Sequence, residues 1–273
     1  MTDKADLPIG IIDSGVGGLT VMKELLDRMP DEPFTYIGDD ARCPYGSRPP
    51  EEVITFTTEM LEALDSFGVK LAVIACNTAT AFALEHVRPL FDFPVIGVIE
   101  PGARTAIAKS EMKQIVVLGT SGTVKSGAYS RAIADLAAEA DVTALACPTF
   151  VPIVERGVYK TPEADETVRQ ALLPLAGASF DAVILGCTHF PLLAPFISKH
   201  LPPGTELITS GSATADTVTG LLASKGALRP AGLTPDIRFY TTGDPQHFRH
   251  ITEDWLELPF AHVEQLNLPY TAE

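Results

Sequence analysis

The chain has 273 residues, of which 46% are hydrophobic and 20% are charged, and its formal net charge is −15. These values are typical of a globular protein with one large domain or two smaller ones and a substantial buried core. The acidic balance, without a basic patch in the sequence, argues against a nucleic-acid partner.

The sequence contains no run of about 18 apolar residues, so it predicts no membrane helix. Residues 2–6 are polar and do not resemble a signal peptide, so we expect a cytoplasmic protein. Cys43, Cys76, Cys147 and Cys187 are too far apart for zinc or thioredoxin-like motifs. We therefore expect free thiols in a reducing compartment and no bound metal.

Short apolar, β-rich runs alternate with stretches of helical periodicity along the chain. The predicted strands are 9–13, 34–37, 71–75, 95–99, 115–119, 142–146, 182–185, 206–208 and 237–241. The predicted helices are 20–28, 51–67, 80–90, 127–140, 162–175, 192–201, 213–224 and 246–256. Continuously apolar strands that alternate with helices predict an α/β fold with parallel sheets covered on both faces.

A faint internal repeat indicates two related α/β halves. Residues 11–16 and 117–122 are both apolar runs that enter a Ser/Gly turn, and Cys76 and Cys187 follow them at similar distances. Any α/β protein repeats strand–turn–helix units, so the similarity also has this simpler explanation.

We predict a first domain of residues 1–98 plus 207–273 and a second domain of residues 99–206. Parallel sheets bind ligands beyond the carboxyl ends of their strands, where the candidate residues fall. We therefore place the site in a cleft shared by the two domains.

Residues 13–18, Asp-Ser-Gly-Val-Gly-Gly, follow the first predicted strand and open the first predicted helix. Their glycines would let backbone N–H groups approach an anion at the helix N-terminus. The spacing does not match the G-x-G-x-x-G fingerprint, so we do not expect a dinucleotide. Asp13 is either a helix cap or a carboxylate that orients a substrate ammonium or tunes a base, and Ser14 lies beside it.

Two further turns follow predicted strands. Pro44-Tyr45-Gly46 predicts a tight turn that is either a plain surface turn or a holder of a carboxylate through its backbone N–H groups. Cys43, just before it, is expected to fill space rather than react. Thr120 and Thr123 either fix a substrate carboxylate or cap the helix that begins near residue 127.

Cys76-Asn77-Thr78 places a thiol, an amide and a hydroxyl at a strand end. A lone cysteine there is usually a buried small hydrophobe. The adjacent Asn and Thr need polar partners, which favours a functional thiol. The N-terminus of the following helix would lower the thiol pKa.

Cys187-Thr188-His189 is the strongest single signal. A histidine two positions from a cysteine can polarise the thiol or donate to a carboxylate. Glu155 is a further candidate acid, although a solvated helix residue is the favoured interpretation. Cys147 lacks polar neighbours and is expected in the core.

Two thiols that face each other across a cleft can remove a proton from one side of a carbon and return one to the other. The two cysteine segments therefore predict a racemase that needs no cofactor. A thiol-redox protein and a non-catalytic amino-acid-binding protein remain alternatives.

Taken together, these motifs resemble the signatures of bacterial glutamate racemases, in the aspartate/glutamate racemase family. The resemblance runs from about residue 9 to residue 256 and includes two supporting segments, 98–103 and 239–245. It implies two flavodoxin-like α/β domains in pseudo-symmetric contact, with the active site between them. It also implies interconversion of L- and D-glutamate without pyridoxal phosphate or metal, supplying D-glutamate for peptidoglycan.

The resemblance also implies roles for individual residues. Cys76 would handle the proton on the D face of the substrate and Cys187 that on the L face, assisted by Asp13, His189 and, as a weaker candidate, Glu155. The implied substrate-binding residues are Asp13, Ser14, Pro44, Tyr45, Gly46, Asn77, Thr78, Thr120, Thr123, Thr188 and His189.

Three further expectations come from the resemblance. Family members are commonly dimers, so a homodimer is expected. Thr209 stands where relatives often carry an acid, which puts a role for that position in doubt. Relatives that are controlled by a cell-wall precursor carry an amino-terminal extension that is not expected here, so we do not expect such control. A sibling racemase acting on aspartate is a further alternative.

Overall fold

The computed structural model describes residues 4–258 and 261–269, and its strands form two sheets. The larger sheet has the order β10-β9-β2-β1-β3-β4 and the smaller one the order β6-β5-β7-β8. Every pairing between described strands is parallel. The strands are β1 (Ile9–Asp13), β2 (Phe34–Gly38), β3 (Leu71–Ile74), β4 (Val95–Gly97), β5 (Gln114–Gly119), β6 (Asp141–Ala146), β7 (Ala182–Gly186), β8 (Glu206–Thr209), β9 (Ile237–Thr241) and β10 (Val263–Gln265).

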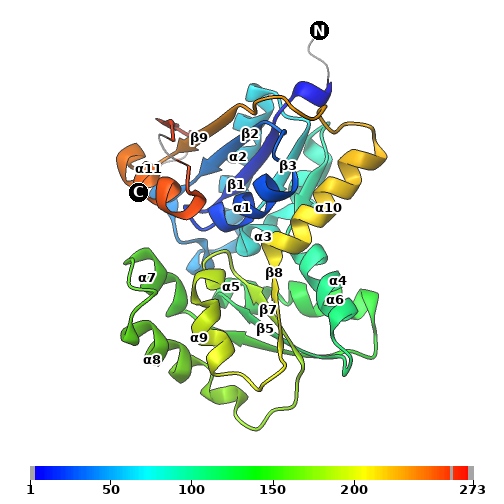
Figure 1. Cartoon of the computed structure of the whole chain (residues 1–273), viewed down its shortest axis with the longest axis vertical. Coiled ribbons are helices and arrows are strands. Elements are labelled where there is room, and N and C mark those ends of the chain that lie inside the picture. The colour runs from blue at the N-terminus through cyan, green and yellow to red at the C-terminus, as the bar shows by residue number, and fades with distance from the viewer. Residues whose placement is uncertain (1–3, 259–260, 270–273) are drawn as a thin grey trace.

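Helices cover both faces of each sheet (Figure 1). They are α1 (Leu19–Arg28), α2 (Pro50–Phe67), α3 (Asn77–Val87), α4 (Ile99–Lys109), α5 (Ser121–Ser126), α6 (Ala128–Leu136), α7 (Phe150–Glu155), α8 (Pro162–Ala171), α9 (Ala194–Lys199), α10 (Ser210–Ser224) and α11 (Pro245–Leu256). Over the residues described, no helix is long and apolar enough to cross a membrane.

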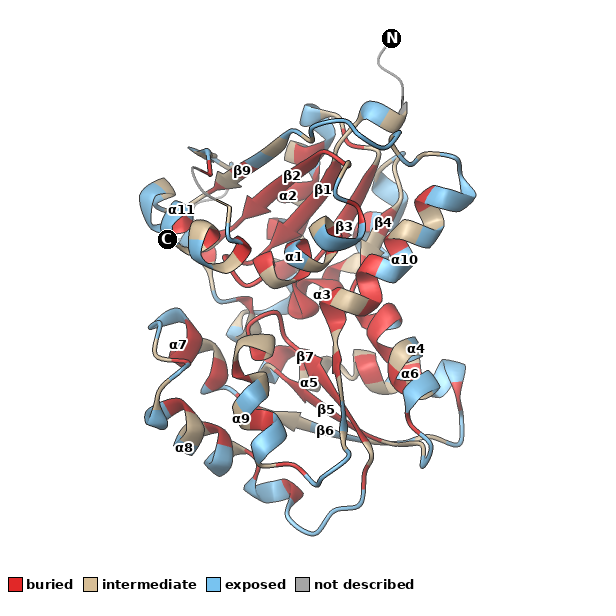
Figure 2. Ribbon diagram, viewed as in Figure 1, coloured by how far each residue is buried: buried red, intermediate tan, exposed pale blue. Residues whose placement is uncertain are grey.

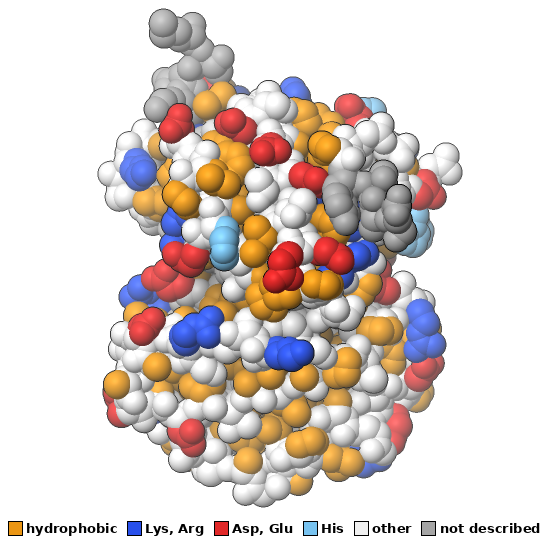
Figure 3. Space-filling view, turned by 180° about the vertical axis from the view of Figure 1, so that it is seen from behind, with side chains coloured by type: hydrophobic (Ala, Val, Ile, Leu, Met, Phe, Trp, Pro, Cys, Tyr) orange, Lys and Arg blue, Asp and Glu red, His pale blue; other side chains and the backbone are white. Residues whose placement is uncertain are grey.

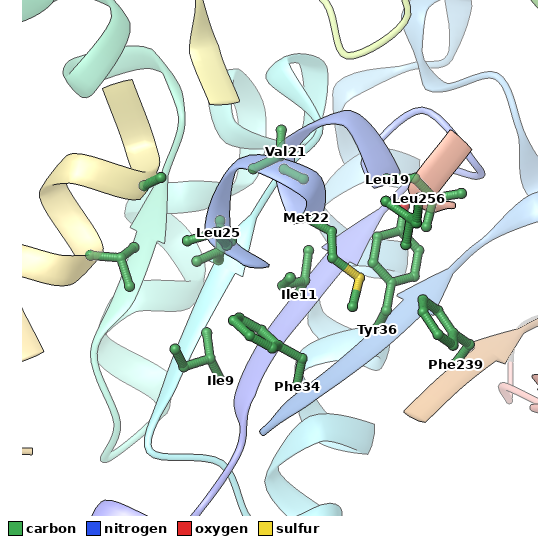
Figure 4. Close-up of a cluster of buried hydrophobic side chains, with 14 of the residues drawn as sticks. Ile9, Ile11, Leu19, Val21, Met22, Leu25, Phe34, Tyr36, Phe239 and Leu256 are labelled. Atoms are coloured by element: carbon green, nitrogen blue, oxygen red, sulfur yellow. The ribbon is translucent and has the colours of Figure 1, made fainter. Parts of the chain in front are cut away.

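Alternate side chains of the central strands fill separate cores on the two faces of the larger sheet. Ile9 and Ile11 pack with Phe34, Tyr36 and residues of α1, and Figure 4 shows this cluster. Ile12 belongs to the core on the opposite face, with residues of α2 and α3. Each buried isoleucine contributes about 1.5–3 kcal/mol. β1 is buried along its whole length, which explains its uninterrupted apolar sequence (Figure 2).

The chain enters the second sheet after β4 and returns to the first sheet through α10. In Figure 1 the early and late parts of the chain lie together around the six-stranded sheet, while the middle part surrounds the four-stranded sheet. β8 pairs with β7, so the predicted boundary at residue 207 falls within a strand of the second sheet. α10 then packs against α1 of the first half and α4 of the second, and so joins the two.

Among the α-helices and strands described, α4, α5, α7 and β10 were not predicted. The prediction of a strand over 95–99 was too long, because β4 ends at Gly97 and α4 begins at Ile99. Pro101 and Gly102 obscured this helix in the sequence. Pro101 lies in the first turn, where a missing N–H costs nothing. A Cβ on Gly102 would lie 3.3 Å from the Tyr129 hydroxyl, so the glycine allows close packing.

Candidate active site

Loops that follow the carboxyl ends of β1, β3, β5 and β7 meet at one small cavity between the two sheets. This is the edge at which α/β proteins bind ligands. Most of the predicted site residues line it, together with Val151 of α7, which was not predicted. The lining residues are Ser14, Pro44, Tyr45, Gly46, Cys76, Asn77, Thr78, Thr120, Val151, Cys187, Thr188 and His189.

Cys76 lies between the end of β3 and the start of α3. Its Sγ accepts a hydrogen bond from the Ala79 N–H at 3.4 Å, so the thiol caps the helix. Burial, assisted by the negative charge of the nearby Asp13, nevertheless raises the pKa of Cys76 to about 12. The sequence predicted a lowered pKa from the helix N-terminus. The hydrogen bond from Ala79 at the helix N-terminus does lower the pKa, but desolvation outweighs it, so the net shift is upward.

Cys187 is the first member of a chain of polar contacts in the second domain. Its Sγ lies 3.8 Å from His189 Nδ1, and His189 Nε2 lies 2.5 Å from Glu155 Oε1. Burial disfavours the imidazolium, but hydrogen bonds to Cys187 and Glu155 hold the pKa of His189 well above its ordinary value. His189 is therefore a proton-bearing group held against one thiol.

Glu155 lies at the end of α7, outside the residues that line the cavity. The favoured interpretation was a solvated helix residue. The Glu155 side chain is 31% exposed, but it is also paired with His189. Burial opposes ionisation, but the hydrogen bond from His189 holds the pKa of Glu155 below its ordinary value. The structure therefore places Glu155 as a carboxylate behind the histidine rather than in the cavity.

Asp13 is fully buried at the end of β1. Its Oδ2 accepts the Gly15 N–H at 3.1 Å, while Oδ1 has no hydrogen-bond partner within the described part of the chain. Burial raises the pKa of Asp13 to about 6, against the lowering influence of the charge on His189. Asp13 thus changes charge close to neutral pH, near the thiol of Cys76.

Replacing Asp13 with asparagine is expected to stabilise the fold increasingly as the pH rises. The folded carboxyl keeps its proton up to about pH 6, whereas the unfolded one loses it near 3.8. The folded chain therefore binds more protons between these values, so the stability of the native protein falls across that range. The full difference between the folded and unfolded pKa values corresponds to about 3 kcal/mol of unfolding free energy. Urea denaturation at pH 5 and pH 8 measures it, and an effect equal at both would contradict this account.

Gly17 is the point at which the turn after β1 touches the second domain. A Cβ at this position would lie 2.3 Å from Thr188 Oγ1 and 2.6 Å from His189 Nδ1. Thr20 Oγ1 also donates to the Thr188 carbonyl at 2.8 Å. The sequence interpretation assigned these glycines to an anion, but here the glycine is required because two domains approach closely.

The turn that contains Tyr45 and Gly46 is not a plain surface turn, so that interpretation was wrong. Tyr45 is 1% exposed, and its hydroxyl donates to Asp39. Asp39 also accepts hydrogen bonds from Arg42 Nε at 2.7 Å and from Thr242 Oγ1 at 2.8 Å. Asp39 therefore fixes the turn that forms one wall of the cavity.

A cluster of threonine hydroxyls joins the two domains at the cavity. Thr78 Oγ1 lies 2.9 Å from Thr120 Oγ1 and 3.1 Å from Thr123 Oγ1. Thr120 also accepts the Thr123 N–H at 3.1 Å, which caps α5. Capping and cavity lining thus coexist at Thr120, whereas Thr123 supports the cluster without lining the cavity.

The two remaining thiols are not among the residues that line the cavity. Cys147 is buried in the core of the second domain, as predicted, and Cys43 lies beside Gly15, where a Cβ would be 3.3 Å from its Sγ. In the part of the chain that the structure describes, no group of three or more His, Cys, Asp or Glu side chains is placed to hold a metal ion.

Several residues around the site were missed by the sequence analysis. Asp39, Tyr129 and Ser210 form hydrogen bonds with residues that line the cavity but do not line it themselves, and no local sequence pattern marks them. Ser210 directly follows Thr209, the position at which the chain departs from the family pattern, but was not itself singled out. Contacts of this kind, behind the residues that line the cavity, depend on how the domains pack together.

Comparison with known proteins supports the family resemblance. The chain is 49% identical to the glutamate racemase of Shouchella clausii, over 96% of this chain and 94% of that protein. It is also 49% identical to the glutamate racemase of Listeria monocytogenes serotype 4b, over 95% of this chain and 98% of that protein.

Solved structures agree with the sequence comparison. The glutamate racemase isoform RacE1 of Bacillus anthracis superposes with a TM-score of 0.93 at 44% identity, covering 97% of this chain and 99% of that chain. The Francisella tularensis glutamate racemase in complex with D-glutamate gives 0.90 at 31% identity, with the same coverage. The predicted fold of two flavodoxin-like α/β domains with parallel sheets is confirmed.

The family model for Asp/Glu/hydantoin racemases matches residues 9–218, a segment that contains Cys76, Cys187 and every other residue that lines the cavity. Because the match covers most of the chain, and relatives nearly half identical cover almost all of it, the chain belongs to the Asp/Glu/hydantoin racemase family.

Proposed function

We propose that this chain interconverts L- and D-glutamate by two-base proton transfer at the α-carbon, without a cofactor. The observation that carries the proposal is that two thiols line one cavity, Cys76 from the first domain and Cys187 from the second. Each follows a central parallel strand of its own sheet. The substrate assignment rests on relatives that are glutamate racemases and are 49% identical to this chain.

In the proposed reaction, one cysteine thiolate takes the α-proton and the other cysteine, as a thiol, gives a proton to the opposite face. Cys76 serves the D face and Cys187 the L face. One thiol is ionised per half-reaction, so the pair titrates as a unit. His189 stands 3.8 Å from Cys187 and can exchange a proton with it, while Asp13 is the titratable group beside Cys76.

The other cavity residues would hold the substrate. Hydroxyls of Ser14, Thr78 and Thr188, the Asn77 amide and backbone N–H groups near Gly46 offer donors for two carboxylates. Donors aimed at the α-carboxylate would stabilise the negative charge that develops when the α-proton leaves. Fixing the substrate between two thiols supplies proximity and orientation.

We further propose that the product D-glutamate is consumed in peptidoglycan synthesis, in the cytoplasm, and that the protein works as a homodimer. Free thiols as catalysts suit a reducing compartment. On the face seen in Figure 3, basic and acidic side chains lie side by side around the waist between the domains. This mixed charge supports a small-molecule substrate rather than a nucleic acid.

The test is incubation of L-glutamate with purified protein in D2O, without added cofactor, while optical rotation and α-deuterium are followed together. We expect loss of rotation with deuterium entering the α-position. Activity with aspartate and not glutamate would keep the family but overturn the substrate. Likeness to the Picrophilus torridus aspartate racemase is limited to the fold, at 20% identity and a TM-score of 0.58. No change with either amino acid would overturn the proposed reaction.

A further inference from the structure

The side-chain amide of Asn77 is hydrogen-bonded through its oxygen, whereas its nitrogen has no partner among the described residues. Asn77 directly follows Cys76, lines the cavity and is 2% exposed. Its Oδ1 accepts a hydrogen bond from the Tyr129 hydroxyl at 2.7 Å and lies 3.3 Å from the Ser210 hydroxyl. Its Nδ2 is buried and has no hydrogen-bond partner among residues 4–258 and 261–269. A buried donor left in this state is costly unless a ligand accepts from it.

The two hydroxyls that hold Asn77 come from outside the first domain's own sheet. Tyr129 belongs to α6 of the second domain, and Ser210 is the first residue of α10, directly after β8. Ser210 Oγ lies 3.1 Å from the Tyr129 hydroxyl and 3.3 Å from the Leu185 carbonyl in β7. The hydroxyl pair therefore contacts both segments that carry the thiols, next to Cys76 on one side and two residues before Cys187 on the other.

The fold makes room for the Tyr129 side chain. A Cβ on Gly186 would lie 3.0 Å from the Tyr129 ring, and one on Gly102 would lie 3.3 Å from its hydroxyl. Burial raises the pKa of Tyr129 above its ordinary value, so the hydroxyl remains protonated and can donate. A donor at this position favours the amide orientation with Oδ1 toward Tyr129 and Nδ2 away from it.

We propose that Tyr129 and Ser210 are positioning residues that orient the Asn77 amide, so that Nδ2 donates to a carboxylate oxygen of the bound amino acid. The inference rests on the proposed function, in that the substrate is an amino dicarboxylate held in this cavity. Neither residue touches the substrate, and their effect passes through Asn77. Because α6 and α10 belong to different parts of the fold, the orientation depends on the two domains being packed together.

Tyr129→Phe removes one hydroxyl and keeps the ring, so it separates positioning from packing. We expect KM for L-glutamate to rise about five- to tenfold while kcat stays within about twofold, since the lost contact is made in ground and transition states alike. Ser210→Ala should act in the same direction. In an Asn77→Ala background, Tyr129→Phe should add nothing further, because the residue through which it acts is gone.

A measurement that does not depend on turnover keeps this inference separate from the proposed reaction. The side-chain ¹⁵N–¹H signals of Asn77 in the full chain should shift in Tyr129→Phe, whether or not glutamate is the substrate. Tyr159→Phe, another buried tyrosine outside the cavity, is the matched control and should leave them in place. Unchanged Asn77 signals in Tyr129→Phe would overturn the inference, as would an effect on KM that adds fully to that of Asn77→Ala.

Discussion

Replacing either Cys76 or Cys187 with alanine is expected to reduce racemisation by at least about 10³-fold while leaving the fold intact. Each thiol serves one face of the α-carbon, so removing it takes away a positioned acid or base that contributes about 10²–10⁴ in rate. Water cannot readily replace it, because both sulfurs are buried. Polarimetry of L- and D-glutamate gives the rates, and circular dichroism with thermal unfolding checks the fold.

Cys147→Ala is the matched control for both variants. Cys147 is also a buried cysteine directly after a parallel strand, β6, but it packs in the second-domain core. Removing its sulfur is expected to cost about 1–2 kcal/mol of stability without a comparable loss of turnover. Near-wild-type racemisation in Cys76→Ala or Cys187→Ala would contradict the two-thiol mechanism.

The same variants test which thiol serves which face. In D2O, any α-exchange that remains in Cys187→Ala should occur with D-glutamate and proceed without inversion, because Cys76 can only take and return a proton on the D face. Cys76→Ala should show the mirror pattern with L-glutamate. Exchange of the opposite enantiomer in each variant would reverse the assignment of faces while preserving the two-thiol chemistry.

The convergence of the candidate residues on one cavity could be predicted from sequence because of how parallel sheets are built. Cys76 and Cys187 each follow a continuously apolar run, and strands of that kind are central and parallel. Central parallel strands end at a common edge, so residues directly after them converge without any knowledge of the helices. For the same reason Ser14 and Thr120, which follow β1 and β5, lie at the same cavity.

Partners from distant segments could not be predicted in this way. Glu155 meets His189, and Tyr129 meets Asn77, only after α6 and α7 have packed onto the second sheet and the two halves have docked. Periodicity places a residue on a face of its own element, but it does not say which side chain faces it across an interface. The raised pKa of Cys76 has the same origin, because desolvation depends on the closed cavity and not on the neighbouring sequence.

Gly17→Ala is expected to lower kcat/KM by about 10²-fold or more, although it adds a single methyl group. That methyl would lie 2.3 Å from Thr188 Oγ1 and 2.5 Å from His189 Cε1, well inside van der Waals contact. Thr188 can rotate its hydroxyl, but the His189 ring is held between Cys187 and Glu155. We expect the clash to be relieved by a shift of the ring or by separation of the domains rather than by movement of the turn after β1, and misplacement by about 1 Å costs roughly 10²-fold in rate.

The matched control for this change is Gly220→Ala in α10, where an added Cβ meets nothing within 4 Å. There the alanine should stabilise the helix by up to about 1 kcal/mol and leave turnover unchanged. In Gly17→Ala, the ¹⁵N shifts of the His189 ring should report weakened contacts to Cys187 and Glu155. Wild-type kcat/KM with unmoved His189 signals would mean that the turn after β1 yields instead of the ring. The close domain contact would then not be what sets the histidine against its thiol.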